Sequence, residues 1–164
     1  MTKKRHQYRL MNTLTRTITL FISQGAYSGR FPVAPGTAGT LVGVFLYWCM
    51  KGLSPVWYGA LLLLIILIGT WAAGRAEVLL GRKDSPSIVI DEIAGYLIAM
   101  FLVPTGWWFV AAGFILFRVF DIMKPYPLKR FEKAPGGLGV MLDDLGAGIY
   151  TNLVLQAAGF VFSR

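Results

Sequence analysis

The chain carries little charge for its length. Charged residues account for 15% of its 164 residues, whereas hydrophobic residues account for 55%, and the mean hydropathy is +0.59. Soluble domains carry about 25% charged residues, so this chain has too few to cover a surface exposed to water. The hydrophobicity also excludes a disordered protein, because a solvated coil needs a polar composition. The sequence therefore predicts an integral membrane protein of about one domain.

Cysteine and histidine each occur only once, as Cys49 and His6. A single cysteine excludes a disulfide scaffold and any cysteine-based zinc site, and a single histidine in a basic, polar segment excludes a histidine-rich metal centre. Acidic residues are scarce as well, which leaves a net charge of +8. Membrane proteins concentrate Lys and Arg on their cytoplasmic side, and no nucleic-acid-binding motif accompanies the charge. Nucleic acid is therefore not an expected partner.

The N-terminal segment, residues 1–30, contains basic residues and no acid. Within it Leu14, Ile18 and Phe21 recur at helical spacing, which predicts an amphipathic helix that lies on the membrane surface. We therefore expect two parts, a basic interfacial segment over residues 1–30 and a single membrane-embedded domain over residues 31–164.

Four apolar stretches follow, and one of them can be interpreted in two ways. They cover residues 37–50, 55–74, 93–117 and 145–162. The third contains Pro-Thr-Gly at residues 104–106, a turn signal, so it forms either one tilted helix or a hairpin of two.

The distribution of charge favours the hairpin. A hairpin places residues 75–91 and 118–144 on the same side as the basic N-terminus, and only Lys51 and Arg164 of the 16 basic residues then lie on the other side. A single span would divide the basic loops between the two sides. The sequence thus predicts an all-α membrane protein of about five membrane helices, with the N-terminus inside and the C-terminus outside.

Five of the eight carboxylates lie near the ends of these predicted helices, on one side of the membrane. Each alone has an ordinary explanation, since acids near a helix N-terminus meet the helix dipole and an Arg–Asp pair at i, i+3 is common on surfaces. Five at one depth, including two adjacent pairs, indicate instead a cluster of hard oxygen ligands, which suits Mg²⁺. These candidate catalytic and metal-binding residues are Asp91, Glu92, Asp121, Asp143 and Asp144.

Candidate phosphate-binding groups accompany the acids. Arg118 and Lys124 share a helical face with Asp121. Residues 34–40 lead directly into an apolar helix, and small residues at a helix N-terminus let backbone N–H groups approach an anion, although they also permit close helix packing. The expected substrate-binding residues are Gly36, Thr37, Gly39, Thr40, Arg118 and Lys124.

An acidic metal site beside phosphate-binding groups at the membrane surface points to the chemistry of lipid phosphates. The residue types that the chain lacks then narrow the mechanism to metal-assisted reactions. A cysteine phosphatase needs Arg six positions after its cysteine, where this chain has Pro55, and a histidine-nucleophile lipid phosphatase needs core histidines. The Asp-x-Asp pattern of aspartyl-phosphate enzymes is absent. Water activated by a metal, or a Thr or carboxylate nucleophile aided by one, is left.

Four ordered motifs resemble those of the bacterial phosphatidylglycerophosphatase A family. They are PGTAGT at 35–40, IDEIAG at 90–95, RVFDIMKPYP at 118–127 and GVMLDDLGAG at 139–148. One small departure is Thr40, where the family pattern leads us to expect Ser. The resemblance implies a Mg²⁺-dependent enzyme of the bacterial inner membrane that hydrolyses phosphatidylglycerophosphate to phosphatidylglycerol at the cytoplasmic face, with no protein partner evident.

Two rival functions differ in what they require. A transporter or channel with an acidic cation-binding vestibule would have carboxylates deep within a span, whereas here they lie at one edge. A CDP-alcohol phosphotransferase would need a longer Asp-x-x-Asp-Gly array, which the sequence lacks.

Overall fold

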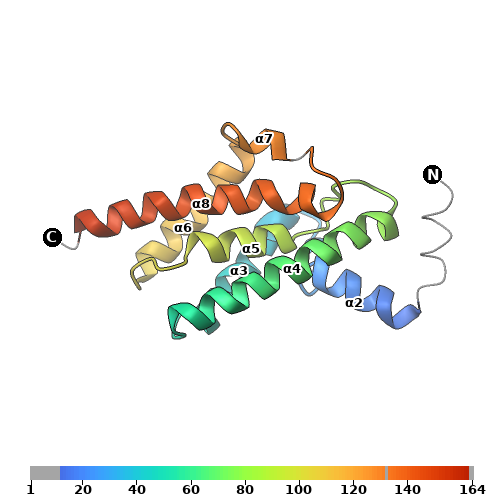
Figure 1. Ribbon diagram of the computed structural model, residues 1–164, viewed down its shortest axis with the longest axis horizontal. Helices are drawn as coiled ribbons and strands as arrows, with labels where there is room; N and C mark the ends of the chain where they lie inside the picture. The colour runs from blue at the N-terminus through green and yellow to red at the C-terminus, as the bar shows by residue number, and fades with distance from the viewer. Residues whose placement is uncertain (1–11, 132, 163–164) are drawn as a thin grey trace.

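The computed structural model describes residues 12–131 and 133–162 of the chain (Figure 1). Within these ranges the structure contains helices and connecting loops and no strand, which confirms the all-α prediction. The elements are α2 (Thr13–Ser23), η1 (Ser28–Arg30), α3 (Pro35–Met50), α4 (Pro55–Leu80), α5 (Ile90–Ala99), α6 (Trp107–Met123), α7 (Leu128–Phe131) and α8 (Gly137–Phe162).

The short helix α5 forms the centre of the bundle. It packs against α3, α4, α6 and α8, and in Figure 1 it lies between α8 and α4. Glycine permits the closest of these contacts, because a Cβ added at Gly95 would lie 2.6 Å from the backbone oxygen of Asp144 and from the Phe117 ring. The backbones of α5 and α8 therefore approach each other directly, and this contact sets the position of the acids that both helices carry.

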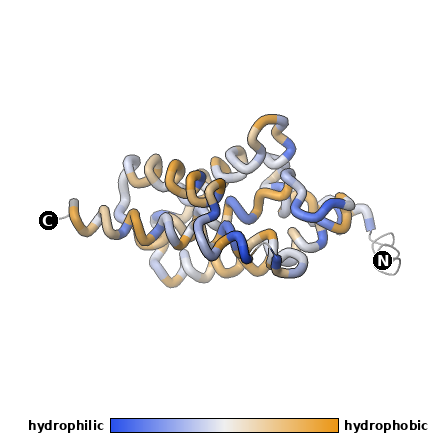
Figure 2. Tube along the Cα trace, turned by 90° about the horizontal axis from the view of Figure 1, so that it is seen from above, coloured by the Kyte–Doolittle hydropathy of each residue, from blue (hydrophilic) through white to orange (hydrophobic). Residues whose placement is uncertain are grey.

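Two helices of the described chain, α4 and α8, are long and apolar enough to cross a membrane. Each has 26 residues, which corresponds to about 39 Å at 1.5 Å per residue. Large hydrophobic side chains of α4, among them Leu63, Leu67 and Trp71, point away from the bundle and are exposed. Figure 2 shows hydrophobic stretches along the helices. The apolar composition of the chain is thus displayed on its surface as well as in its core.

The prediction of about five membrane-spanning helices is not confirmed in that form. The chain does leave helical structure between Ala99 and Trp107, around the predicted Pro-Thr-Gly turn. However, α5 has only ten residues, about 15 Å, which is half the thickness of a bilayer's hydrocarbon core. Most of its residues are buried by neighbouring helices, so its apolar composition reflects burial in protein rather than contact with lipid.

Helix α8 begins eight residues earlier than the sequence predicts, at Gly137 instead of Leu145. Gly137 packs against the backbone of α4, where the amide nitrogen of Gly137 would lie 2.9 Å from a Cβ added at Gly74. Asp143 and Asp144 therefore lie in the second turn of α8 and do not open it. The helix dipole acts within the first turn, so it does not explain why these two acids are tolerated there.

Helix α2 turns its hydrophobic residues outward. Leu14, Ile18 and Phe21 are exposed, whereas Thr19 and Ser23 are buried, and the helix packs against α4. This arrangement is the reverse of a soluble amphipathic helix and suits a helix at a lipid interface. The rest of the predicted interfacial segment includes residues 1–11, which lie outside the described residues.

Candidate active site

One cleft brings together residues from α3, α5, α6, α8 and the loop between α4 and α5. It has a volume of about 230 Å³. All five predicted acids line it, together with three of the predicted substrate-binding residues, Gly36, Arg118 and Lys124. The other lining residues are Ala34, Pro35, Asp84, Ser85, Pro86 and Ile88. The sequence prediction that distant acids gather at one end of the bundle is thus matched by the geometry.

Three of the acids form a compact group of oxygen atoms. Asp91 and Glu92 come from the first turn of α5 and Asp144 from the second turn of α8, and one carboxylate oxygen of each lies within 4.8 Å of the others. Asp91 is 8% exposed and Asp144 3% exposed. One buried oxygen of Asp91 and one of Glu92 have no hydrogen-bond partner among the described residues. Buried carboxylates at this spacing repel one another unless a cation lies between them.

The two remaining acids face basic side chains. Asp121 Oδ2 lies 2.6 Å from Arg118 Nη1, which is also 3.9 Å from Glu92 Oε1. Asp143 forms a short ion pair with Lys124, the residue that ends α6 in a left-handed conformation. These four side chains are largely buried, so the pairs form in a poorly solvated part of the cleft. Asp91, Glu92 and Asp144 therefore form a group of three, in which Glu92 also contacts Arg118, and Asp121 and Asp143 each form a close ion pair with a cation.

The glycine-rich segment contributes less than the sequence predicts. Gly36 lies against the site, since a Cβ there would run into the Glu92 carboxylate and lie 3.1 Å from Arg118 Nη1. Thr37, Gly39 and Thr40, in contrast, are not among the residues that line the cleft. Gly39 packs against Val89, and the buried Thr40 hydroxyl donates to the Gly36 carbonyl at 2.9 Å. The expectation that the Thr40 hydroxyl contacts phosphate is therefore not supported, because a contact within the helix already uses it.

Asp84 also lies at the cleft, although it is not among the five candidate acids predicted from the sequence. It lines the cleft from the loop between α4 and α5, with φ at +47°, and its backbone N–H donates to Glu77 Oε1 at 2.8 Å. Asp84 lies outside the four motifs. Its place at the cleft depends on the loop between α4 and α5 folding back over the acids, which no local sequence pattern indicates. Its neighbours Ser85 and Pro86 line the cleft for the same reason.

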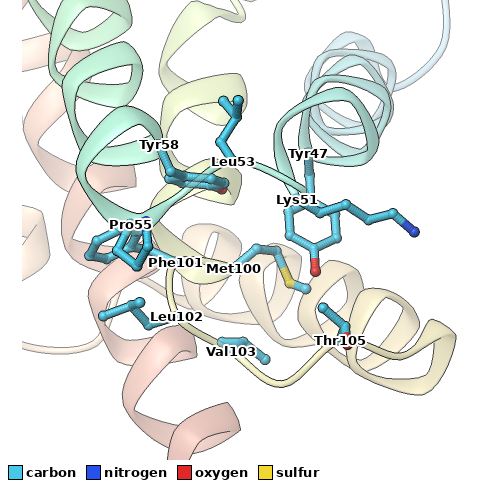
Figure 3. Close-up of a pocket in the computed structure, with 10 residues that line it drawn as sticks. All are labelled: Tyr47, Lys51, Leu53, Pro55, Tyr58, Met100, Phe101, Leu102, Val103 and Thr105. Atoms are coloured by element: carbon cyan, nitrogen blue, oxygen red, sulfur yellow. The ribbon is translucent and has the colours of Figure 1, made fainter.

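A second hollow lies at the opposite end of the bundle (Figure 3). Tyr47, near the end of α3, points toward Thr105 of the loop between α5 and α6, whereas the Lys51 side chain extends away from that loop and its ammonium lies over the Trp48 ring. The residues that line this hollow include no carboxylate, so it offers no ligands for a hard cation. The acidic cleft is therefore the stronger candidate for the active site.

The fold and the cleft together define a class: a strongly apolar protein, helical in its described residues, whose cluster of buried carboxylates is compatible with a bound metal ion. Comparison with known proteins then identifies the family. The chain belongs to the phosphatidylglycerophosphatase A family, whose model matches residues 21–159. The resemblance drawn from the four sequence motifs is thereby confirmed, and the chain is a phosphatase rather than a transporter or channel.

Individual relatives cover most of the chain. Phosphatidylglycerophosphatase A of Escherichia coli is 36% identical over 140 residues, which is 84% of this chain and 81% of that protein. The enzyme of the same name from Haemophilus influenzae is 37% identical over 139 residues, 83% of this chain and 85% of its own. A Bacteroides thetaiotaomicron protein, provisionally named a phosphatidylinositol-3-phosphatase, is 38% identical over 152 residues, 88% and 95% of the two chains. No solved structure matches the chain.

Proposed function

We propose that this protein hydrolyses phosphatidylglycerophosphate to phosphatidylglycerol and phosphate, that the reaction requires Mg²⁺, and that it takes place at the cytoplasmic face of the bacterial inner membrane. The observation that carries the proposal is the group of three carboxylates, Asp91, Glu92 and Asp144, with oxygen atoms within 4.8 Å of one another. Arg118 and Lys124, each ion-paired with another acid, line the same cleft. Membership of the family supports the substrate.

The residues present fit a Mg²⁺ ion. Asp91, Glu92 and Asp144 offer only hard oxygen donors, and two of their buried oxygens lack hydrogen-bond partners in the described part of the chain. Mg²⁺ is bound in many phosphoryl-transfer sites by a few carboxylates together with water and substrate phosphate. When bound, the ion supplies the Lewis acidity that stabilises charge on the phosphoryl oxygens.

Arg118 and Lys124 are the proposed phosphate-binding residues. Each is held by an acid, Arg118 by Asp121 at 2.6 Å and Lys124 by Asp143, and both line the cleft. A fixed guanidinium or ammonium stabilises developing negative charge without reorganising during the reaction. Gly36 has no side chain, so the backbone at the start of α3 approaches Glu92 and Arg118 closely, where a Cβ would run into the Glu92 carboxylate.

The proposed reaction consumes one water molecule. The water oxygen forms a bond to phosphorus, the bond between phosphorus and the terminal glycerol oxygen breaks, and that oxygen takes up a proton. One carboxylate of the cleft orients the water and accepts its proton, a role that a buried acid held next to a cation can fill. Phosphatidylglycerol and inorganic phosphate are the products.

The two-ended arrangement supports the proposed membrane orientation. Lys51 and Thr105 line one hollow, whereas Asp84, Asp91 and Asp144 line the cleft at the other end. We propose that α3, α4, α6 and α8 cross the membrane around α5 and its following loop. The basic loops then lie with the cleft on the cytoplasmic side, in agreement with the usual distribution of Lys and Arg.

A substrate panel tests this function. The purified protein, in vesicles, would be given phosphatidylglycerophosphate, phosphatidylinositol-3-phosphate, phosphatidic acid and glycerol 3-phosphate, and phosphate release would be measured with Mg²⁺, with EDTA, and after Mg²⁺ is restored. We expect phosphatidylglycerophosphate to be hydrolysed fastest, EDTA to abolish release and Mg²⁺ to restore it. Preference for phosphatidylinositol-3-phosphate, the substrate in the Bacteroides relative's name, would refute the proposed substrate, and full turnover in EDTA would refute the metal.

A further inference from the structure

We infer that Gln24 is a positioning residue of the active site, through which the N-terminal segment holds the rim of the acidic cleft and the start of α5. The inference rests on the proposed function, because it assigns Gln24 the task of placing Asp91 for metal binding. Gln24 lies in none of the four sequence motifs and just after the end of α2.

The side chain of Gln24 connects two segments that are distant in sequence. It is 3% exposed. Its Nε2 donates to Ser87 Oγ at 3.2 Å, and its Oε1 accepts from Arg30 Nε at 2.8 Å. Ser87 Oγ in turn lies 3.1 Å from Ser85 Oγ. A buried amide with both ends hydrogen-bonded fixes its surroundings, since an unsatisfied end would cost the desolvation of a polar group.

Backbone contacts hold the same two segments together. The Val89 N–H donates to the Ser23 carbonyl at 2.9 Å. Gly29 packs on the loop so closely that an added Cβ would lie 2.9 Å from the Ser87 carbonyl carbon and 3.0 Å from Val89. Residues 23–30 and 85–89 therefore form one packed unit, with the Gln24 amide as its side-chain connection.

This unit leads directly into the proposed metal ligands. Ser85 lines the cleft, and Val89 is the residue immediately before α5, whose first turn carries Asp91 and Glu92. Residues hydrogen-bonded directly to metal ligands usually affect metal affinity or activity about 10- to 100-fold. Gln24 acts one step further out, through the loop that leads into α5, so its effect should lie at the lower end of that range. Loss of the Gln24 hydrogen bonds should therefore weaken metal binding before it weakens the fold.

The chain offers both a conservative variant and a matched control. Gln24→Met keeps the length and burial of the side chain but removes the hydrogen bonds, whereas Gln24→Glu still accepts from Arg30 and can accept from the Ser87 hydroxyl. The control is Asn152→Leu. Asn152 is another amide that bridges segments, since its Nδ2 donates to the carbonyls of Ile98, Ala99 and Phe101 at the far end of α5.

The experiment measures metal binding separately from turnover. Mn²⁺ binding to the full chain in detergent is followed by electron paramagnetic resonance, alongside the Mg²⁺ concentration for half-maximal phosphate release and the Tm without metal. We expect Gln24→Met to raise both metal concentrations about tenfold, Gln24→Glu to restore them to within about twofold, and Asn152→Leu to lower the Tm without changing metal affinity. If Gln24→Met lowers only the Tm, the inference is wrong. The Mn²⁺ measurement decides the matter even if phosphatidylglycerophosphate proves not to be the substrate.

Discussion

At the scale of single residues, acids that look alike in the sequence have different neighbours in the cleft. Asp91, Glu92 and Asp144 face one another, whereas Asp121 and Asp143 face Arg118 and Lys124. The sequence predicted that these seven side chains share one end of the molecule, because charge in an apolar chain is confined to few places. It did not predict the division, which depends on side-chain distances between α5, α6 and α8.

Neutralising the acids of the group of three should abolish turnover without unfolding the protein. We expect Asp91→Asn and Asp144→Asn each to reduce phosphate release from phosphatidylglycerophosphate about 10²-fold or more, as the loss of a preorganised charge typically does. The metal-free Tm should stay equal or rise, because one repulsive charge has been removed from a buried cluster. Both quantities are measured at matched purity, with Mg²⁺ titrated.

Glu77→Gln is the control for this experiment. Gln keeps the oxygen that accepts from the Asp84 N–H, and Glu77 does not line the cleft, so activity should stay near that of the unmodified protein. Asp121→Asn and Asp143→Asn extend the series, since each leaves a cation without its ionised partner, and we expect losses of similar size. Unchanged rates in Asp91→Asn or Asp144→Asn would exclude these carboxylates as ligands or bases.

At the residue scale, Thr40 and Asp84 lie differently from what the sequence predicts, and both differences have one physical cause. Thr40 carries a hydroxyl in a motif, yet it turns inward and binds the carbonyl of Gly36. Asp84 lies in a loop outside the motifs, yet it lines the cleft. Which way a side chain points on a helix, and where a loop folds back, depend on tertiary packing that hydropathy and spacing do not report.

At the scale of helices, the sequence predicted the order and the breaks well and the lengths poorly. The predicted starts of the first two apolar stretches, at residues 37 and 55, lie within two residues of the starts of α3 and α4, and the turn after α5 was visible as the Pro-Thr-Gly signal. The short length of α5 was not, because burial in protein and burial in lipid select the same apolar residues. The early start of α8 was also hidden, since it depends on the contact of Gly137 with the backbone of α4.

The contact between α5 and α8 should be sensitive to a single methyl group. In Gly95→Ala the new Cβ would meet the Asp144 carbonyl and the Phe117 ring at 2.6 Å, so the helices must separate. We expect a loss of about 1–3 kcal/mol in the free energy of unfolding, the usual cost of overpacking, together with lower activity because Asp144 moves with α8. The measurement is unfolding in mixed micelles, with activity assayed in parallel.

A matched substitution on α4 separates packing from helix propensity. A Cβ at Gly59 would lie 4.0 Å from Phe101, an ordinary contact. Gly59→Ala should therefore stabilise the protein by about 0.5–1 kcal/mol, as Ala does in helix interiors. If Gly95→Ala proved equally stabilising, the close approach of α5 and α8 would be contradicted.

At the scale of the whole molecule, apolar and charged residues are separated in two ways. Exposed hydrophobic side chains cover the outer surfaces of the helices, and α2 adds an outward apolar face near the cleft end. The acids and their cations gather at that end, whereas the hollow at the other end has Lys51 as its charged lining residue. This separation suits an enzyme that receives a lipid headgroup at one membrane surface while its helices stay in the bilayer.

Labelling of introduced cysteines tests this orientation. In a Cys49→Ser background, Arg82→Cys marks the loop between α4 and α5 beside the cleft, and Thr105→Cys marks the loop between α5 and α6 at the other end; both positions are exposed. Because basic loops stay on the cytoplasmic side, a membrane-impermeant maleimide added to intact spheroplasts should label Thr105→Cys and leave Arg82→Cys unlabelled until the cells are broken. Each variant must first retain phosphatase activity.

Labelling of both positions from the same side would show that the α5–α6 hairpin does not reach the far surface. Labelling of Arg82→Cys alone in intact spheroplasts would invert the orientation, place the cleft on the outer side of the membrane and refute the proposed cytoplasmic active site.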